Sequence, residues 1–88
     1  MVKWKLVYTK QAQKDAKKIA AAGLQKKTES ILDIISQNPF QFPPPYEKLL
    51  GDFSGTYSRR INIQHRIVYQ VLEDQRVVKI LRLFTHYE

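Results

Sequence analysis

The sequence predicts a single α+β domain in which a helical hairpin packs on a mainly antiparallel sheet. Residues 10–36 carry apolar side chains at helical spacing, and one glycine interrupts this pattern. The last third of the chain has three β-rich segments joined by short polar turns, and short connections imply antiparallel neighbours. The 88 residues suit one compact domain without a repeat or a linker. We therefore expect the order β-α-α-β-β-β over residues 1–88.

The first half of the chain reads as one strand followed by two helices. Residues 3–8 are rich in β-forming side chains and predict the strand. Thr9 can cap the helix that follows, and Gly23 ends it because glycine readily adopts the left-handed conformation found after helices. A second helix is predicted over residues 24–36. Pro39 stops it, because proline disfavours the α conformation in the residue before it.

The second half begins with an aromatic and proline-rich connector at residues 39–46. Its three consecutive prolines predict an extended, stiff arm that fixes where Glu47 and Lys48 lie. A turn is predicted at residues 51–55. The final strand has apolar side chains on both faces, which suits an interior place in the sheet. The three strands are predicted at residues 56–63, 66–72 and 77–84.

The charge of the chain favours a polyanionic partner. Fifteen Lys and Arg against eight Asp and Glu give a formal net charge of +7. Residues 1–37 hold eight Lys and no Arg, whereas all five Arg fall between residues 59 and 82. Because the planar guanidinium suits bidentate contacts to phosphate, this arginine segment indicates nucleic-acid binding. Charge alone leaves acidic proteins and anionic lipids open as alternatives.

The composition excludes several kinds of site. The chain has no Cys, which removes disulfides, thiolate metal sites and cysteine nucleophiles. With only two His, we expect neither a metal nor another cofactor. No apolar run approaches the ~20 residues that cross a bilayer, and residues 1–8 lack the apolar core of a signal peptide. We therefore expect a cytoplasmic protein without a membrane partner.

The predicted strand at residues 56–63 has one polar face, which we expect to be open, and one packed face. One register of the following hairpin places Arg60 opposite Arg66, and such a pair of like charges would need an anion between them. A shift by one residue would put the two on opposite faces, and the sequence leaves this register open. The open face carries Thr56, Ser58, Arg60 and Asn62, and the packed face carries Tyr57, Arg59, Ile61 and Ile63.

Four side chains, taken together, suggest RNA cleavage without a metal. Taken singly, Glu47 reads as a solvated carboxylate and His86 as part of a frayed tail. Together with Arg60 and Arg66, however, they supply every group that this reaction requires. A base removes the proton of the 2′-hydroxyl, cations stabilise the phosphorane, and an acid protonates the leaving 5′-oxygen.

These residues lie in a pattern that closely resembles the YoeB/Txe toxins of the RelE/ParE superfamily. The resemblance implies a RelE-like, microbial-RNase-like fold and a ribosome-dependent endoribonuclease, or mRNA interferase, that cuts mRNA in the ribosomal A site. It also implies a cognate antitoxin of the YefM/Phd type, and a homodimer is a further option. The matching segments are EKL at 47–49, SG at 54–55, YSRRI at 57–61, HRIVY at 65–69 and HY at 86–87.

Carried over by this resemblance, Glu47 is the general base and His86 the general acid. Arg66 is the main phosphate clamp and Arg60 supports it. Tyr87 would orient the scissile nucleotide through its hydroxyl or by stacking.

Two neighbours in the motif are expected to lie outside catalysis. Arg59 belongs to the packed face, and His65 reads as a structural residue of the hairpin. The chain departs from the family pattern in a longer last hairpin and in Glu88, which follows the usual terminal tyrosine. We expect the final strand to end near Phe84, so that His86 would have to fold back toward the arginines.

Two other functions share much of this evidence. A ParE-like toxin that inhibits DNA gyrase has the same fold but needs no acid, base or terminal histidine. A basic module that binds RNA without chemistry would use the same lysine-rich helices. The presence of Glu47, Arg66, His86 and Tyr87 together favours the nuclease.

Overall fold

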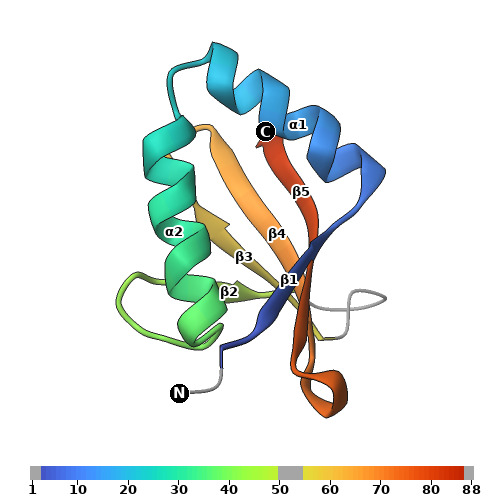
Figure 1. Cartoon of the computed structure of the whole chain (residues 1–88). Helices are drawn as coiled ribbons and strands as arrows, with labels where there is room; N and C mark the ends of the chain where they lie inside the picture. The colour runs from blue at the N-terminus through green and yellow to red at the C-terminus, as the bar shows by residue number, and fades with distance from the viewer. Residues whose placement is uncertain (1–2, 50–54, 87–88) are drawn as a thin grey trace.

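The computed structural model describes residues 3–49 and 55–86, the last three by their backbone alone. The predicted turn at residues 51–55 and Tyr87 therefore fall largely or wholly outside the described residues. Two helices pack on one face of a five-stranded sheet (Figure 1). The elements are β1 (Lys5–Tyr8), α1 (Lys10–Ala21), α2 (Gln25–Gln37), β2 (Glu47–Lys48), β3 (Thr56–Arg60), β4 (His65–Leu72), the 3-10 turn η2 (Glu73–Gln75) and β5 (Val77–His86).

The strand order β1-β5-β4-β3-β2 confirms the predicted α+β class and the interior place of the final strand. The β1–β5 pair is parallel. The helices connect β1 to β2 at the opposite edge of the sheet, and the chain then returns through β3 and β4 to place β5 beside β1. The pairs β2–β3, β3–β4 and β4–β5 are antiparallel. Strand β2 is an element that the sequence does not predict, and it places Glu47 in an edge strand of the sheet rather than after a free arm.

The helical hairpin forms where the sequence indicates. The Thr9 hydroxyl accepts a hydrogen bond from the Ala12 amide at 3.0 Å and so caps α1. Gly23, at φ 74°, makes the left-handed turn between the helices. Among the described residues, no helix is long and apolar enough to span a membrane. The core between helices and sheet contains Ala12, Ile19, Ile31, Ile35, Ile61, Ile67, Tyr69, Val78, Ile80 and Leu83.

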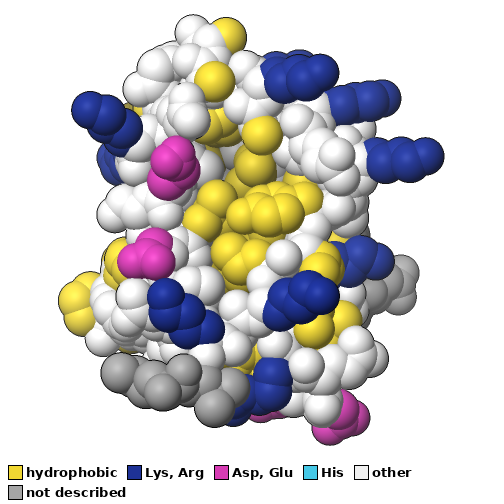
Figure 2. All heavy atoms as spheres, in the orientation of Figure 1, with side chains coloured by type: hydrophobic (Ala, Val, Ile, Leu, Met, Phe, Trp, Pro, Cys, Tyr) yellow, Lys and Arg dark blue, Asp and Glu magenta, His cyan; other side chains and the backbone are white. Residues whose placement is uncertain are grey.

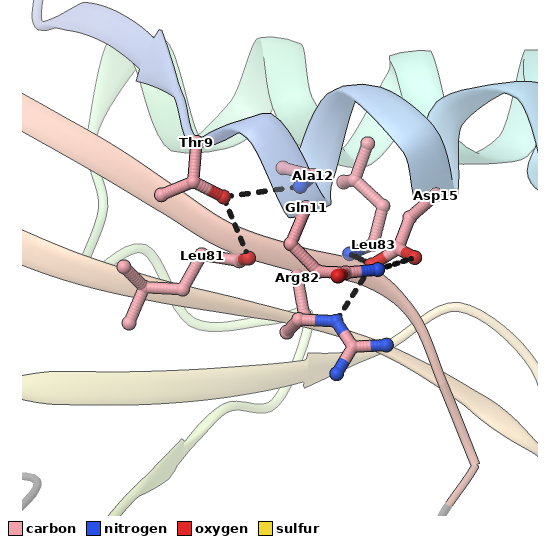
Figure 3. Close-up of polar contacts among 7 residues, drawn as sticks. All are labelled: Thr9, Gln11, Ala12, Asp15, Leu81, Arg82 and Leu83. Atoms are coloured by element: carbon pink, nitrogen blue, oxygen red, sulfur yellow. Dashed lines mark hydrogen bonds and ion pairs between the residues drawn. The ribbon is translucent and has the colours of Figure 1, made fainter.

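Helix α1 also replaces a missing strand at the edge of β5 (Figure 3). Beyond the end of β1, the Thr9 hydroxyl donates to the Leu81 carbonyl at 2.9 Å. The buried Asp15 carboxylate then accepts from the Leu83 amide at 3.1 Å and from the Arg82 Nε at 2.8 Å. Polar side chains of the helix thus satisfy strand groups that would otherwise be buried without partners.

An apolar hollow of about 240 Å³ lies between the two helices, and Figure 2 shows this hydrophobic surface at the centre of the helical face. Tyr8, Ile19, Leu32 and Leu83 contribute to its lining. Lysine and arginine side chains project around it, as expected for a basic chain.

Two predicted strand ends and the predicted conformation of the connector are wrong. Strand β3 ends at Arg60 rather than at residue 63, because the Asn62 side chain accepts from the amides of Gln64 and His65 at 2.9 and 2.7 Å and closes a tight turn. Strand β5 continues to His86, because β4 remains available as its partner. The connector bends at residues 42–44, where the Phe42–Pro43 and Pro43–Pro44 peptide bonds are cis, instead of forming an extended arm.

Candidate active site

Strands β3 and β4 pair in the register that places Arg60 opposite Arg66. The neighbouring Ile67 packs in the core under the helices, and side chains alternate along a strand, so both arginines belong to the opposite face of the sheet. Arg60 is exposed and Arg66 is half-buried. The pairing therefore places two cations side by side. The sequence had left open whether the register of the hairpin would do so.

Glu47 provides the negative charge that such a pair requires. Strand β2 aligns Glu47 with Ser58 of β3, and Arg66 lies on the next strand. The Arg66 Nη1 donates to the Glu47 Oε1 at 3.2 Å and to the Ser58 hydroxyl at 3.4 Å. The Glu47 side chain is 67% exposed and that of Arg66 20% exposed, so this ion pair adds little to stability and can be exchanged for another partner.

A cleft of about 590 Å³ opens beside this ion pair. Prolines and Tyr46 of the connector form one wall, and the β3–β4 turn with Lys27 of α2 forms another. Lys27 is a cation of the site that the sequence does not indicate, because only the tertiary fold brings this residue of α2 to the same cleft as β3. The lining residues are Lys27, Pro44, Pro45, Tyr46, Glu47, Ser58, Arg60, Ile61, Asn62, Ile63 and Arg66.

The chemistry of this cleft suits a phosphate ester. Arg60 and Arg66 offer guanidinium donors to phosphate oxygens, and Glu47 offers an accessible carboxylate next to them. Within residues 3–49 and 55–83, no group of three or more His, Asp or Glu side chains could hold a metal ion. A phosphodiester that takes the place of Glu47 on Arg66 would have the released carboxylate beside it as a proton acceptor.

Strand β5 carries the backbone of His86 to the same end of the sheet. Thr85 pairs with Arg66, and His86 pairs with His65. The expectation that the tail must fold back from residue 84 is therefore wrong, because the strand itself reaches the arginines. Tyr87, the remaining predicted site residue, lies outside the described part of the chain.

The two motif residues that we excluded from catalysis are both buried. Arg59 is 1% exposed and lies on the helix side of the sheet, as predicted. His65 is 9% exposed at the start of β4, where a structural role in the hairpin was expected.

The predicted faces of β3 hold only in part. Thr56 and Ser58, expected on an open face, are 3% and 1% exposed. Ile63, expected in the core, is 90% exposed. The strand ends at Arg60, so strict alternation does not extend to Ile63, and the turn formed by Asn62 points this side chain to solvent.

Comparison with known proteins agrees with this fold. A family model described as the ParE toxin of type II toxin–antitoxin system, parDE, matches residues 6–88. The Toxin YoeB of Synechocystis is 34% identical over 65 residues, which cover 74% of this chain and 73% of that protein. The Toxin YoeB of Streptomyces coelicolor is 40% identical over 53 residues, 60% of this chain, and the chain spans 63% of that relative's length.

Solved structures extend the similarity to nearly the whole chain. The YoeB/ParE toxin from Agrobacterium tumefaciens superposes with a TM-score of 0.84 at 29% identity and covers 94% of this chain and 99% of that chain. A chain of the YoeB–YefM complex from Staphylococcus aureus gives 0.79 at 32% identity, with 96% and 98% covered.

The fold and these similarities define the chain as a toxin of a type II toxin–antitoxin system. Within that class, it belongs to the YoeB family of the RelE/ParE toxins. The resemblance inferred from the motifs is thereby confirmed.

Proposed function

We propose that this toxin is a ribosome-dependent mRNA interferase that cuts mRNA in the A site without a metal. Toxins of the YoeB/RelE family are known as endoribonucleases. The observation that carries the proposal is the 3.2 Å contact between Glu47 and Arg66 at a cleft that Arg60 also lines. This contact supports the proposal, because a carboxylate and a guanidinium that lie this close can both reach one phosphodiester.

The proposed reaction begins at Glu47, whose carboxylate accepts the proton of the 2′-hydroxyl. The 2′-oxygen attacks phosphorus, and Arg66 with Arg60 stabilises the negative charge of the phosphorane. The bond to the 5′-oxygen then breaks as His86, in its protonated form, donates a proton to that oxygen. The products are a 2′,3′-cyclic phosphate and a 5′-hydroxyl, and Tyr87 is proposed to hold the scissile nucleotide in place.

The proposed partners follow from charge and from the relatives. A net charge of +7 suits the RNA-rich surface of the bacterial ribosome, and we place the toxin in the cytoplasm on that ground. Solved relatives include a YoeB–YefM complex and a YoeB dimer from Staphylococcus aureus. We propose that a YefM/Phd-type antitoxin covers the arginine-bearing face with an acidic segment, and that a second copy of the chain is an alternative partner.

The decisive experiment is primer extension on a translated mRNA, with and without ribosomes. We expect cleavage at the A-site codon only when ribosomes are present, and a loss of about 10²–10⁴ in rate for Glu47→Gln. Glu73→Gln, which changes a carboxylate on the η2 turn outside the cleft, is the matched control and should cleave normally. RNA binding without cleavage by the native toxin would contradict the proposal and favour the passive binding module.

The ParE description of the family model supports one other candidate, a gyrase inhibitor. DNA supercoiling by purified gyrase distinguishes the two. If equimolar toxin inhibited supercoiling and the mRNA stayed intact in the ribosome assay, the nuclease hypothesis would be rejected in favour of the gyrase inhibitor.

A further inference from the structure

We propose that Arg59 is a positioning residue for Glu47, which it holds in place through the connector at residues 39–46. The inference rests on the proposed role of Glu47 as the base. Arg59 follows Ser58, the residue that pairs with Glu47, but its side chain lies on the buried side of the sheet. It therefore reaches Glu47 through the chain that leads to it and not through the cleft.

The buried guanidinium of Arg59 is bound mainly by the backbone of the connector. Its Nη1 donates to the Pro44 carbonyl at 2.7 Å. Its Nη2 donates to the carbonyls of Pro39 and Gln41 at 3.0 and 2.9 Å. Its Nε donates to the Tyr69 hydroxyl at 3.1 Å. One planar group thus ties together three carbonyls of a segment that has no strand or helix of its own.

Tyr69 reinforces this arrangement from β4. Its hydroxyl accepts from Arg59 and donates to the Pro39 carbonyl at 2.9 Å. Burial raises the pKa of Tyr69 to about 12, although the adjacent Arg59 acts to lower it. The hydroxyl therefore keeps its proton at neutral pH and remains a donor to the connector.

The buried Arg59 guanidinium is stable only while the connector keeps its observed conformation. A buried charge is costly unless hydrogen bonds and compensating dipoles surround it. The Arg59 guanidinium carbon also lies 4.9 Å from the centre of the Tyr46 ring, a cation–π contact. Any displacement of residues 39–46 would remove several of these partners at once, so the connector is held strongly in one conformation.

The position of Glu47 depends on the connector because the strand that contains Glu47 is short. Strand β2 has two residues, Glu47 and Lys48, at the edge of the sheet. Tyr46 directly precedes Glu47 and contacts Arg59, and Pro44 is fixed two residues earlier. A displacement of about 1 Å at a catalytic group can lower a rate by about 10²-fold. The connector is thus in a position to set the activity of the base.

A double-mutant cycle separates positioning from general loss of stability. Arg59→Lys keeps the positive charge but cannot donate in one plane to four acceptors. We expect it to lower the single-turnover cleavage rate on saturating ribosomes by about 10–100-fold, with little change in ribosome affinity. In a Glu47→Gln background, the same change should lower the rate by no more than about twofold, because the base that it positions is already gone.

The matched control is Asp15→Asn, which alters another fully buried charged residue, one whose carboxylate holds α1 to β5. Its effect on the rate should be the same with Glu47 or Gln at position 47. Equal losses for Arg59→Lys in both backgrounds would show a merely structural role and overturn the proposal. If Arg59→Lys does not fold, Tyr69→Phe removes one bond of the same network and should show the same coupling with a smaller loss.

Amide hydrogen exchange tests the placement of β2 without any cleavage assay. The Leu49 amide donates to the Thr56 carbonyl at 2.9 Å, directly after Glu47 and Lys48. Arg59→Lys should accelerate exchange of this amide by about tenfold or more, while the Thr28 amide of α2, bonded to Leu24 at 2.9 Å, stays protected. Unchanged protection of Leu49 would refute the proposal. Full activity of Glu47→Gln would instead refute the role of Glu47 as the base. The exchange experiment would then still report whether Arg59 fixes the position of β2.

Discussion

Replacing Asp15 by alanine should be among the most destabilising single changes in the chain. The side chain is completely buried, and its Oδ2 accepts from the Leu83 amide at 3.1 Å and from Arg82 at 2.8 Å. Alanine leaves the Leu83 amide buried without an acceptor, which costs about 1–3 kcal/mol. The Arg82 side chain is 41% exposed and can turn to water, so the lost ion pair adds only about 0.5–1 kcal/mol. We expect a total loss of about 1.5–4 kcal/mol in the free energy of unfolding.

Urea unfolding at neutral pH measures this loss directly, and a thermal melt should show a midpoint lower by about 10–20 °C for a domain of this size. Asp15→Asn retains a side-chain oxygen for the Leu83 amide and should lose less than half as much. Asp33→Ala, at an exposed position on α2, should stay within about 0.5 kcal/mol of the native protein. If the alanine and asparagine variants at position 15 were equally stable, the amide contact would contribute nothing and the reasoning would be refuted.

Three further outcomes are expected. Arg66→Ala should remain folded but lose about 10²–10³ in ribosome-dependent cleavage rate, and wild-type cleavage by the folded variant would exclude Arg66 as the phosphate clamp. Thr9→Ala should lower the free energy of unfolding by about 1–2 kcal/mol in urea titrations, since its hydroxyl accepts from Ala12 and donates to Leu81; an unchanged midpoint would contradict this. The raised pKa of Tyr69 means that unfolded chains lose this proton first, so stability should fall from about pH 10 to 12, and Tyr69→Phe should flatten that fall.

The sequence was sufficient for the parts of the fold that depend on local patterns. Thr9, Gly23 and Pro39 act on their own backbone or on residues close to them in the chain, so the limits of both helices could be predicted within a few residues. The buried side of Arg59 also followed from alternation along one strand. These features need no knowledge of distant contacts.

The features that were missed depend on pairing between distant segments. Glu47 and Lys48 have no marked β-propensity, and β2 exists only because Ser58 and Tyr57 lie beside them. The register that places Arg60 opposite Arg66 is fixed by the tight turn at Asn62, which single-strand patterns did not predict.

The same reason applies to the C-terminal segment and to the cleft. The extension of β5 to His86 required the free length of β4, which is known only once the sheet is assembled. Lys27 enters the cleft because α2 crosses the sheet at this point. Tertiary neighbours, rather than local propensity, decided each of these positions.

The contact between Glu47 and Arg66 has a consequence for how the toxin responds to ionic strength. A cation on a bare surface gathers dissolved anions, and a phosphate that binds it meets the salt in solution as competitor. Arg66 instead carries a tethered counterion, the Glu47 carboxylate, whose effective concentration does not change when salt is added. RNA that takes its place also releases this carboxylate beside the substrate. A phosphate that binds Arg66 therefore displaces no anion from solution, although the RNA still releases its own cations, and this contact should be less sensitive to salt than those of Arg60 and the helix lysines.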